Sequence, residues 1–317
     1  METRILGKTG WEVGVIGLGA WNIGGQWGEV TEGDALATIH AALEGGVNLI
    51  DTADAYGIPP GRCEELVGKA IRSWKQNVIV CTKVGEYAER YGHPLSYRTP
   101  LHVTLCCEAS LRRLGVDAID LYLCHIGYLD NPSIFLEAFS ELKKAGKIRE
   151  YGISAHYPEV VERFNKEDAC AVVELDYSII NRRHERELLP YCLEHNIGTI
   201  VRGALRRGIL SGKYQSDTRF SDSVRKVWNS GRGRDTYLRM LDIVEQLRFL
   251  ESTERSMANA ALQFVLANPA VSVVLAGAKT PEQAKSNALA SGGRLSAEEL
   301  AKIGSVVREM EAIVLDH

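Results

Sequence analysis

The sequence lacks the features that would place it in a membrane, on a nucleic acid or outside the cell. No apolar run approaches the roughly 20 residues that a membrane-spanning helix needs. The 37 basic and 41 acidic residues leave a formal net charge of -4, which offers no basic surface to a nucleic acid or an anionic membrane. The opening METRILGKTGWEVG has no apolar core of the kind found in secretory signals. We therefore expect a cytoplasmic protein without nucleic-acid or membrane partners.

Cysteine spacing typical of a metal site is also missing. The seven cysteines are an odd number and are scattered along the chain. Cys81, Cys106 and Cys124 lie inside apolar runs, where a buried and reduced thiol is the ordinary finding. The adjacent Cys106 and Cys107 fall on an expected helix and do not form a ligand pair. These features predict reduced thiols and no metal.

What is present is an ordinary globular composition with a regular alternation of segments. Hydrophobic residues make up 45% and charged residues 25% of 317 residues, and no linker, internal repeat or low-complexity tract divides the chain. Although this length would also suit two domains, a single α/β barrel commonly reaches it. We expect one domain that spans residues 1–317.

Short apolar segments alternate with amphipathic ones from end to end. The apolar segments lack the period-two pattern of half-buried strands, as expected for parallel strands buried on both faces. They occupy residues 15–18, 48–50, 78–82, 121–124, 151–154, 172–175, 199–202 and 273–276. Helical segments are expected at 34–44, 100–114, 132–145, 158–165, 183–195, 235–250 and 281–290. The alternation predicts an α/β fold, a closed (β/α)8 TIM barrel.

Three segments extend this minimal repeat. Residues 4–13, with Lys8-Thr9-Gly10 at the centre, predict a β-hairpin that closes the N-terminal end of the barrel. Residues 203–234 are much longer than a usual βα loop, and long loops in compact domains are commonly functional. Residues 296–315 are amphipathic and predict an extra C-terminal helix outside the barrel.

Polar side chains follow several of the expected strands. Active sites of such barrels lie at the C-terminal ends of the strands, so these side chains share one rim: Asp51, Tyr56, Lys83, His125, Ser154, Glu174 and Arg202. Four of them suit carbonyl reduction, which delivers a hydride to carbon and a proton to oxygen. A tyrosine has a pKa near 10, and a neighbouring ammonium lowers that pKa. A carboxylate can hold the lysine, and a histidine can orient the carbonyl.

Each of these four residues also has an ordinary structural role when it is considered alone. Asp51 at a strand end could cap a turn, and a loop tyrosine such as Tyr56 often serves packing. Lys83 could be solvated, and His125 could be a core histidine. Their common place on adjoining strand ends is not explained by such separate roles. The combination indicates a reductase site.

The segments around these residues resemble the catalytic segments of the aldo-keto reductases. The matching segments are Asp51-Thr-Ala-Asp-Ala-Tyr56-Gly, Cys81-Thr-Lys83 and Leu121-Tyr-Leu-Cys-His125. Further similar segments follow in the family's order over the whole chain, at residues 17–21, 143–154, 181–182, 208–214 and 277–287. They are most similar to the bacterial and channel-subunit branches. The resemblance implies that Tyr56 is the general acid, Lys83 lowers its pKa, Asp51 pairs with Lys83, and His125 orients the carbonyl.

The resemblance also implies a nicotinamide cofactor, usually NADPH and less often NADH, bound across the barrel mouth without a Rossmann domain. The chain itself has no dinucleotide-binding glycine fingerprint in a βαβ frame. The positions that match the family's cofactor site are Gly19, Ala20, Trp21, Asp51, Ser154, Glu174, Arg202, Gly203, Ala204, Leu205, Gly208, Leu210, Gly212, Lys213, Gly277, Lys279, Thr280, Gln283 and Asn287.

Some of these positions depart from the family pattern. Ala155 and Glu174 stand where the family commonly has asparagine and glutamine, and a carboxylate cannot donate a hydrogen bond to a carboxamide oxygen. His156 is either a substitute donor or a helix cap. Arg202 replaces an aromatic residue that often stacks under the nicotinamide, and its planar guanidinium can also stack.

The choice between the two cofactors depends on positive charge. Gly277 and Gln283 stand where many NADPH enzymes have lysine and arginine, whereas Lys279 is retained. The basic loop of residues 203–234 either supplies charge to the 2′-phosphate or is simply solvated. We expect NADP, with NAD as the alternative.

Aromatic residues on the rim loops predict the substrate pocket. The expected substrate residues are Trp21, Trp27, Tyr56, Tyr87 and His125, and Tyr91, Tyr128 and Trp228 either extend the pocket or pack their own loops. Such walls suit small-molecule carbonyl or alcohol substrates: aldehydes, ketones or sugars. Two alternatives remain, a cofactor-binding regulatory subunit with little turnover, and a barrel whose Ala155 and Glu174 have abolished cofactor binding.

Overall fold

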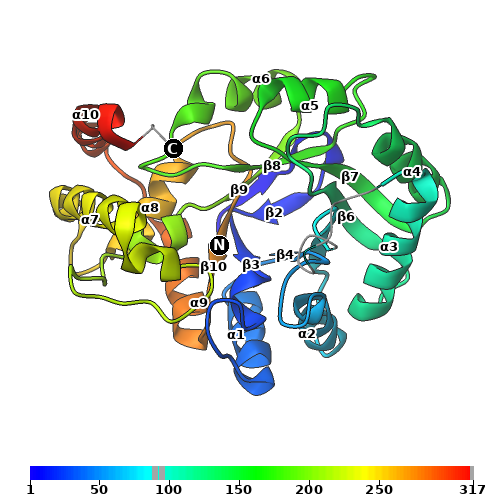
Figure 1. Ribbon diagram of the computed structural model, residues 1–317, viewed down its shortest axis with the longest axis horizontal. Helices are drawn as coiled ribbons and strands as arrows, with labels where there is room; N and C mark the ends of the chain where they lie inside the picture. The colour runs from blue at the N-terminus through cyan, green and yellow to red at the C-terminus, as the bar shows by residue number, and fades with distance from the viewer. Residues whose placement is uncertain (88–91, 93–96, 315–317) are drawn as a thin grey trace.

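The computed structural model describes residues 1–87, 92 and 97–314. Its centre is a closed barrel of eight parallel strands, surrounded by helices (Figure 1). The strands, in chain order around the barrel, are β3 (Ile16–Gly19), β4 (Leu49–Asp51), β5 (Ile79–Val84), β6 (Ile119–Cys124), β7 (Ile148–Ser154), β8 (Val172–Asp176), β9 (Gly198–Arg202) and β10 (Val273–Gly277). β10 pairs with β3, and this pairing closes the barrel. The expected (β/α)8 barrel is confirmed.

Each of the eight strands expected from the sequence overlaps one of these strands. β6 and β7 begin two and three residues earlier than expected, because polar residues hide their starts from a search for apolar runs. Asp120 lies inside β6, and its carboxylate accepts a hydrogen bond from the backbone N–H of Val80 at 2.9 Å. Glu150 lies inside β7 and pairs with Lys143 at 2.7 Å. These strand starts lie near the surface, so they tolerate charge.

Ten α-helices are found among the described residues: α1 (Glu32–Glu44), α2 (Arg62–Arg72), α3 (Pro100–Leu114), α4 (Ser133–Lys144), α5 (Pro158–Phe164), α6 (Leu188–Glu194), α7 (Gly231–Gln246), α8 (Met257–Leu266), α9 (Pro281–Ala288) and α10 (Ala297–Val314). The sequence expectation omits α2 and α8. α8 is buried around almost its whole circumference, so it lacks an amphipathic period. α7 begins at Gly231, inside the segment expected to be loop, and the expected helix 183–195 is a 3-10 turn followed by α6.

A hairpin of β1 (Thr3–Ile5) and β2 (Glu12–Gly14) closes the N-terminal end of the barrel, as expected. Leu6 and Val13 are fully buried and pack against the innermost residues of the barrel. The guanidinium of Arg4 donates to the carbonyl oxygens of Val271 at 2.6 Å and Leu266 at 2.8 Å. The first residues of the chain are therefore fixed to its last quarter.

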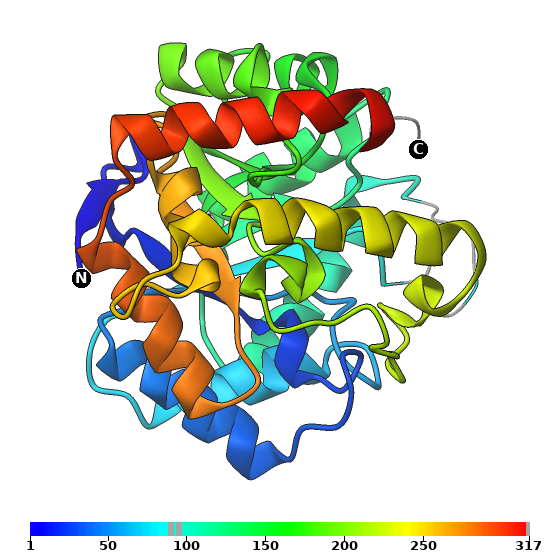
Figure 2. The same cartoon turned by 90° about the vertical axis from the view of Figure 1, so that its left-hand side faces the viewer.

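The expected C-terminal helix is also present, because α10 runs beside α7 on one flank of the barrel (Figure 2). The long segment after β9 contains two 3-10 turns, Arg206–Ser211 and Lys226–Asn229, before α7 begins. Within the described part of the chain, no helix has the length and apolar character to cross a membrane.

The barrel interior is apolar at its N-terminal end and charged at its C-terminal end. Alternate residues of a strand face the same side, so Leu49, Cys81 and Val172 of the apolar layer are each followed two residues later by a polar side chain. Those polar residues are Asp51, Lys83 and Glu174, and all three are buried. A charged layer therefore covers the apolar core, directly below the mouth of the barrel.

Candidate active site

The four residues expected to carry out the chemistry lie together at the mouth of the barrel. Asp51 ends β4, Lys83 lies near the end of β5, and His125 directly follows β6. Tyr56 follows β4 on a turn whose backbone is hydrogen-bonded from Tyr56 N–H to Ala53 O. The centre of the Tyr56 ring is 5.0 Å from Lys83 Nζ and 5.7 Å from the His125 ring. The fold thus gathers residues that are 74 positions apart in the sequence, counted from Asp51 to His125.

Lys83 is completely buried, and its ammonium group donates hydrogen bonds to residues at the end of β4. Nζ donates to both carboxylate oxygens of Asp51, at 2.7 and 2.5 Å, and to the carbonyl oxygen of Thr52 at 3.0 Å. Although burial disfavours the charged form, Asp51 and Glu174 raise the pKa of Lys83 well above its ordinary value. Lys83 is therefore a fixed positive charge below Tyr56.

Tyr56 is held between other side chains and is 7% exposed. Its ring stacks on Trp21, with ring centres 5.5 Å apart, and meets His125 edge to face. The side-chain oxygen of Gln26 accepts hydrogen bonds from Trp21 Nε1 at 2.7 Å and from Gly57 N–H at 2.8 Å. Gln26 thereby ties the loop after β3 to the loop that carries Tyr56.

Burial and charge act on the Tyr56 phenol in opposite directions. Burial raises the pKa of Tyr56 above its ordinary value, and the negative charges of Asp51 and Glu174 add to the increase. The Lys83 ammonium acts to lower this pKa. Tyr56 therefore keeps its proton at neutral pH, and Lys83 reduces the cost of giving that proton away.

Glu174 reaches Lys83 from across the barrel. Its carboxylate is fully buried, and Oε2 lies 3.2 Å from Lys83 Nζ. Oε1 accepts a hydrogen bond from Ser154 Oγ at 3.2 Å and lies 3.5 Å from Arg202 Nε. Burial and Glu174 both raise the pKa of Asp51, whereas Lys83 lowers it. The sequence placed Glu174 on the rim but did not predict its contact with Lys83.

Arg202 connects Glu174 to His156. The Arg202 Nη2 atom is 2.7 Å from His156 Nε2, and the His156 ring stacks on that of His184. Burial and Arg202 lower the pKa of His156 to about 4, so the ring is neutral and accepts this hydrogen bond through Nε2. Its Nδ1 is buried and has no hydrogen-bond partner among the described residues. His156 does not cap a helix, since α5 begins after Tyr157.

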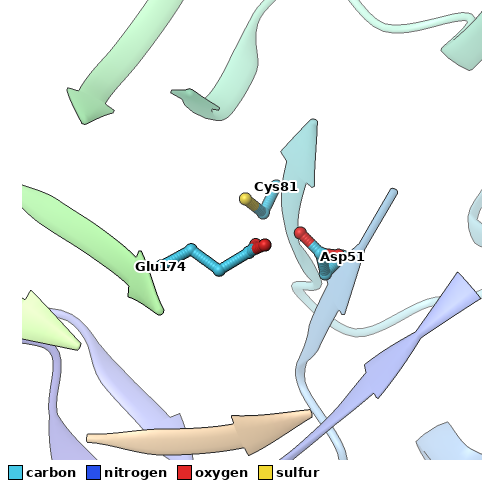
Figure 3. A group of neighbouring side chains, drawn as sticks. All are labelled: Asp51, Cys81 and Glu174. Carbon is cyan, nitrogen blue, oxygen red and sulfur yellow. The ribbon is translucent and has the colours of Figure 1, made fainter. Parts of the chain in front are cut away.

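Asp51, Cys81 and Glu174 lie close enough together to suggest a metal site (Figure 3). The position between the two carboxylates, however, is taken by the Lys83 ammonium group, which contacts both. Burial raises the pKa of Cys81 well above its ordinary value, so its sulfur remains a thiol, whereas a metal binds the thiolate. The geometry describes a lysine site with two counter-ions.

A second group of charged residues lies where the cofactor phosphates are expected. Burial lowers the pKa of Lys213, and the nearby positive charges of Arg225 and Lys279 lower it further. Lys279 Nζ donates to the carbonyl oxygen of Trp27 at 3.0 Å. The segments after β9 and β10 therefore carry three cations that affect one another, and Lys279 binds the β10 segment to the loop after β3.

Around Arg225, the long loop after β9 packs against neighbouring residues. The Arg225 guanidinium pairs with Asp222 at 2.8 Å and lies 5.5 Å from the centre of the Trp27 ring. Ser223 Oγ donates to the carbonyl oxygen of Gln26 at 3.0 Å. This part of the loop therefore reaches across to the loop after β3, and the expectation of a merely solvated loop does not apply to it.

The other expected cofactor residues divide into three groups. Ala204 and Leu210 are fully buried, and Gly208 and Gly212 have positive φ angles of 89° and 72° in the turn after β9. Near β10, side chains bind their own backbone: Thr280 accepts from Gln283 N–H at the start of α9, Gln283 accepts from Lys279 N–H, and Asn287 donates to Gly277 O. Gly19, Ala20, Trp21, Gly203 and Leu205 lie at the ends of β3 and β9. Most of these residues shape the loops.

The expected substrate residues are only partly gathered at the mouth. Trp21 and Trp27 meet edge to face at 5.0 Å beside Tyr56. The Tyr87 ring lies 5.8 Å from the Arg113 guanidinium of α3. Trp228 is buried against Phe220 and Tyr237, so it packs its own loop. Tyr128 is 65% exposed, and Tyr91 lies outside the described residues.

Two polar residues of the site were not expected from the sequence. Gln26 is buried between Trp21 and Gly57, and Glu86 Oε2 lies 3.9 Å from His125 Nδ1. Neither residue ends a strand or belongs to a segment quoted for the resemblance. The position of Gln26 between two tryptophans of one short loop is the only signal that could have drawn attention to it.

Comparison with known proteins finds similar sequences and structures. The sequence model of the Aldo/keto reductase family matches residues 15–308. Aldo-keto reductase YhdN of Bacillus subtilis is 33% identical, over 97% of this chain and 94% of its own. The NADH-specific methylglyoxal reductase of Escherichia coli is 31% identical, over 93% and 95%. The structure of a glycerol dehydrogenase from Gluconobacter oxydans aligns with a TM-score of 0.81 and 31% identity, over 97% and 95%.

Proposed function

Because the chain belongs to the aldo/keto reductase family, we propose that it interconverts a small carbonyl compound and its alcohol with NADP and with Tyr56 as the proton donor. The observation that carries this proposal is the position of the Tyr56 ring, 5.0 Å from a completely buried lysine. Asp51 holds that lysine by both carboxylate oxygens. A neighbouring ammonium acts to lower the pKa of a phenol, which supports the role of Tyr56 as the proton donor.

The residues fit a nicotinamide dinucleotide at both ends. At the phosphate end, the cationic Lys213, Arg225 and Lys279 suit a phosphate group. At the nicotinamide end, Glu174 Oε2 and His156 Nδ1 are buried polar atoms without a hydrogen-bond partner among the described residues. A carboxamide offers an N–H to the first and an oxygen to the second. When bound, the cofactor supplies the hydride for the carbonyl carbon.

The side chains of the site divide the remaining work. Tyr56 donates its phenolic proton to the carbonyl oxygen, and Lys83 stabilises the phenolate that is left. Asp51 keeps Lys83 in place, because its two oxygens bind the ammonium at 2.7 and 2.5 Å. His125, edge to face with Tyr56, orients the carbonyl oxygen. Trp21 covers the Tyr56 ring and excludes water from it.

The alternative of a regulatory subunit with little turnover gains no support from the relatives described above, which are named as reductases and a dehydrogenase. We propose a single domain of residues 1–317 with small-molecule substrates. A cytoplasmic location is also proposed, and the seven cysteines, none of which forms a disulfide, are consistent with a reducing compartment.

The substrate class is tested with a panel of carbonyl compounds. The relatives act on methylglyoxal and glycerol according to their names, so we propose small aldehydes, ketones and sugars for this chain. Purified protein with NADPH is expected to oxidise the cofactor in the presence of at least one of these compounds. The nicotinamide absorbance measures the rate. Tight cofactor binding without turnover on the whole panel would contradict the proposed reaction and favour the regulatory alternative.

The cofactor preference is tested by titration. We expect NADPH to bind more tightly than NADH, because Lys213, Arg225 and Lys279 can meet the 2′-phosphate. Replacing one of these cations, in Lys279→Met, is expected to weaken NADPH binding about tenfold and to leave NADH binding nearly unchanged. Dissociation constants measured by tryptophan fluorescence at several salt concentrations provide the comparison.

The matched control for that variant is Lys285→Met. Lys285 is exposed on α9 and close in sequence to Lys279. Its replacement should leave the dissociation constants of NADPH and NADH unchanged. Equal binding of NADH and NADPH at low salt would show that the three cations do not contact the 2′-phosphate, and the NADP assignment would then be wrong.

A further inference from the structure

The barrel mouth contains one more pair of charges than the family's usual pattern implies. Glu174 and Arg202 stand where glutamine and an aromatic residue are common. They join Asp51 and Lys83, so that four charged side chains come from β4, β5, β8 and β9. Their formal charges cancel. Their surroundings, however, differ from one charge to the next.

The inner pair is compact, and it leaves Glu174 without a hydrogen bond from Lys83. The three N–H groups of Lys83 are directed to the two oxygens of Asp51 and to the carbonyl of Thr52. Glu174 Oε2 therefore lies 3.2 Å from the ammonium as a charge contact alone. It is a fully buried carboxylate oxygen without a hydrogen-bond donor among the described residues.

Arg202 does not neutralise Glu174 as effectively as the formal sum suggests. The closest distance between the two groups is 3.5 Å, and the Arg202 side chain is 36% exposed, whereas Glu174 is completely buried. Water screens a partly exposed charge more strongly than a buried one. The guanidinium also turns towards His156. A buried negative charge therefore acts more strongly on the mouth than its exposed counter-ion does.

This imbalance affects a nicotinamide ring, which carries a positive charge only in its oxidised form. We propose that Glu174 sets the balance between the two forms, by binding the oxidised cofactor more tightly than an uncharged glutamine would, and that Arg202 acts in the opposite direction. The inference rests on the proposed function. It concerns the charge of this residue, which is separate from its ability to bind a carboxamide.

The redox consequence follows from the affinities. When the ring gives up a hydride, the electron pair leaves with the hydrogen and the ring gains one positive charge. Tighter binding of the oxidised form makes the bound reduced form a stronger hydride donor. For this two-electron couple, a tenfold change in the affinity ratio is about 30 mV in reduction potential. Glu174 would thus favour carbonyl reduction on the protein.

The test compares two substitutions with opposite expected signs. Dissociation constants for NADP⁺ and NADPH are measured by tryptophan fluorescence on wild type, Glu174→Gln and Arg202→Met. Glu174→Gln is expected to weaken the binding of NADP⁺ about tenfold relative to the binding of NADPH. Arg202→Met is expected to change the ratio in the other direction. The double variant should shift the ratio in the same direction as Glu174→Gln but by less, because the buried carboxylate acts more strongly than the partly exposed guanidinium.

The matched control makes the same chemical change elsewhere. Glu150→Gln removes a carboxylate from the partly exposed start of β7, at the other end of the barrel, and the ratio should stay at its wild-type value. A thermal melt of each variant without cofactor reports structural damage separately. If Glu174→Gln does not fold, Arg202→Met tests the same proposal by itself.

The outcomes separate the inference from the function on which it rests. If Glu174→Gln and Arg202→Met change both dissociation constants in equal proportion, or change only the melting temperature, Glu174 is a structural carboxylate and the inference is wrong. If wild type binds neither form of the cofactor, the proposed function fails first. Opposite shifts of the ratio in the two variants establish the electrostatic role.

Discussion

Replacing Tyr56 by phenylalanine is expected to lower kcat for carbonyl reduction by at least ~10²-fold, which is the lower end of the range for removing a general acid. The phenyl ring can keep the stacking contact with Trp21 and the edge contact with His125, because the change removes only the hydroxyl group. Burial raises the pKa of Tyr56, so the wild-type residue carries the proton that the reaction consumes. Phenylalanine has no proton to give.

Steady-state rates and a cofactor titration check this prediction together. The cofactor dissociation constant should change little, because the hydroxyl group is not needed to bind the phosphates or the carboxamide. Tyr128→Phe is the matched control, since Tyr128 lies on the loop after β6 and is 65% exposed. Near-wild-type turnover in Tyr56→Phe would remove Tyr56 from the mechanism.

Replacing Lys83 by methionine is expected to lower the free energy of unfolding by about 3–5 kcal/mol, the usual effect of removing one partner of a buried ion pair. Methionine fills much of the same space, but Asp51 and Glu174 then remain as two buried carboxylates without their common cation. Lys69→Met is the control, because Lys69 and its partner Glu32 are both exposed. Such a surface pair contributes little to stability.

The decrease in the free energy of unfolding caused by Lys83→Met should also depend on pH. Burial and Glu174 raise the pKa of Asp51, and Lys83 is the group that opposes them. Without Lys83, a folded protein holds a proton on this cluster at pH values where the unfolded chain has released it. Stability is then highest at acidic pH and falls as pH rises through the raised pKa. Urea unfolding at pH 5 and pH 8 measures the difference. A loss below 1 kcal/mol that is the same at both values would contradict this prediction.

The barrel could be predicted because its strands are short apolar segments at regular intervals. The sequence hides the parts of the fold that break this pattern for a physical reason. Asp120 and Glu150 occupy strand ends near the surface, where charge costs little. α8 is enclosed on all sides and has no polar face to reveal its period. The ends of a strand or helix are therefore hardest to predict from sequence where the burial of its residues changes.

The gathering of Asp51, Tyr56, Lys83 and His125 could be predicted to the level of a shared rim, because parallel strands align their C-terminal ends. The contact between Lys83 and Glu174 could not, since it spans the barrel from β5 to β8 and depends on the reach of two side chains. Gln26 shows the same limit in a loop. Its role depends on a turn that brings Gly57 within 2.8 Å of its side chain, and no local pattern encodes that distance.

The pairing of β3 with β10, together with the contact from Arg4 to Val271, has a consequence for biosynthesis. The two ends of that contact are separated by 267 residues. At ~5–20 residues per second, the ribosome needs roughly 15–50 s to make the chain between them. The hairpin and β3 emerge early. β1 can pair with β2 and β3 with β4, but the edge of β3 that binds β10 must remain unpaired for that time. Closure of the barrel is therefore a late event, and a nascent chain stalled before β10 exposes an open strand edge that chaperones or other chains can bind.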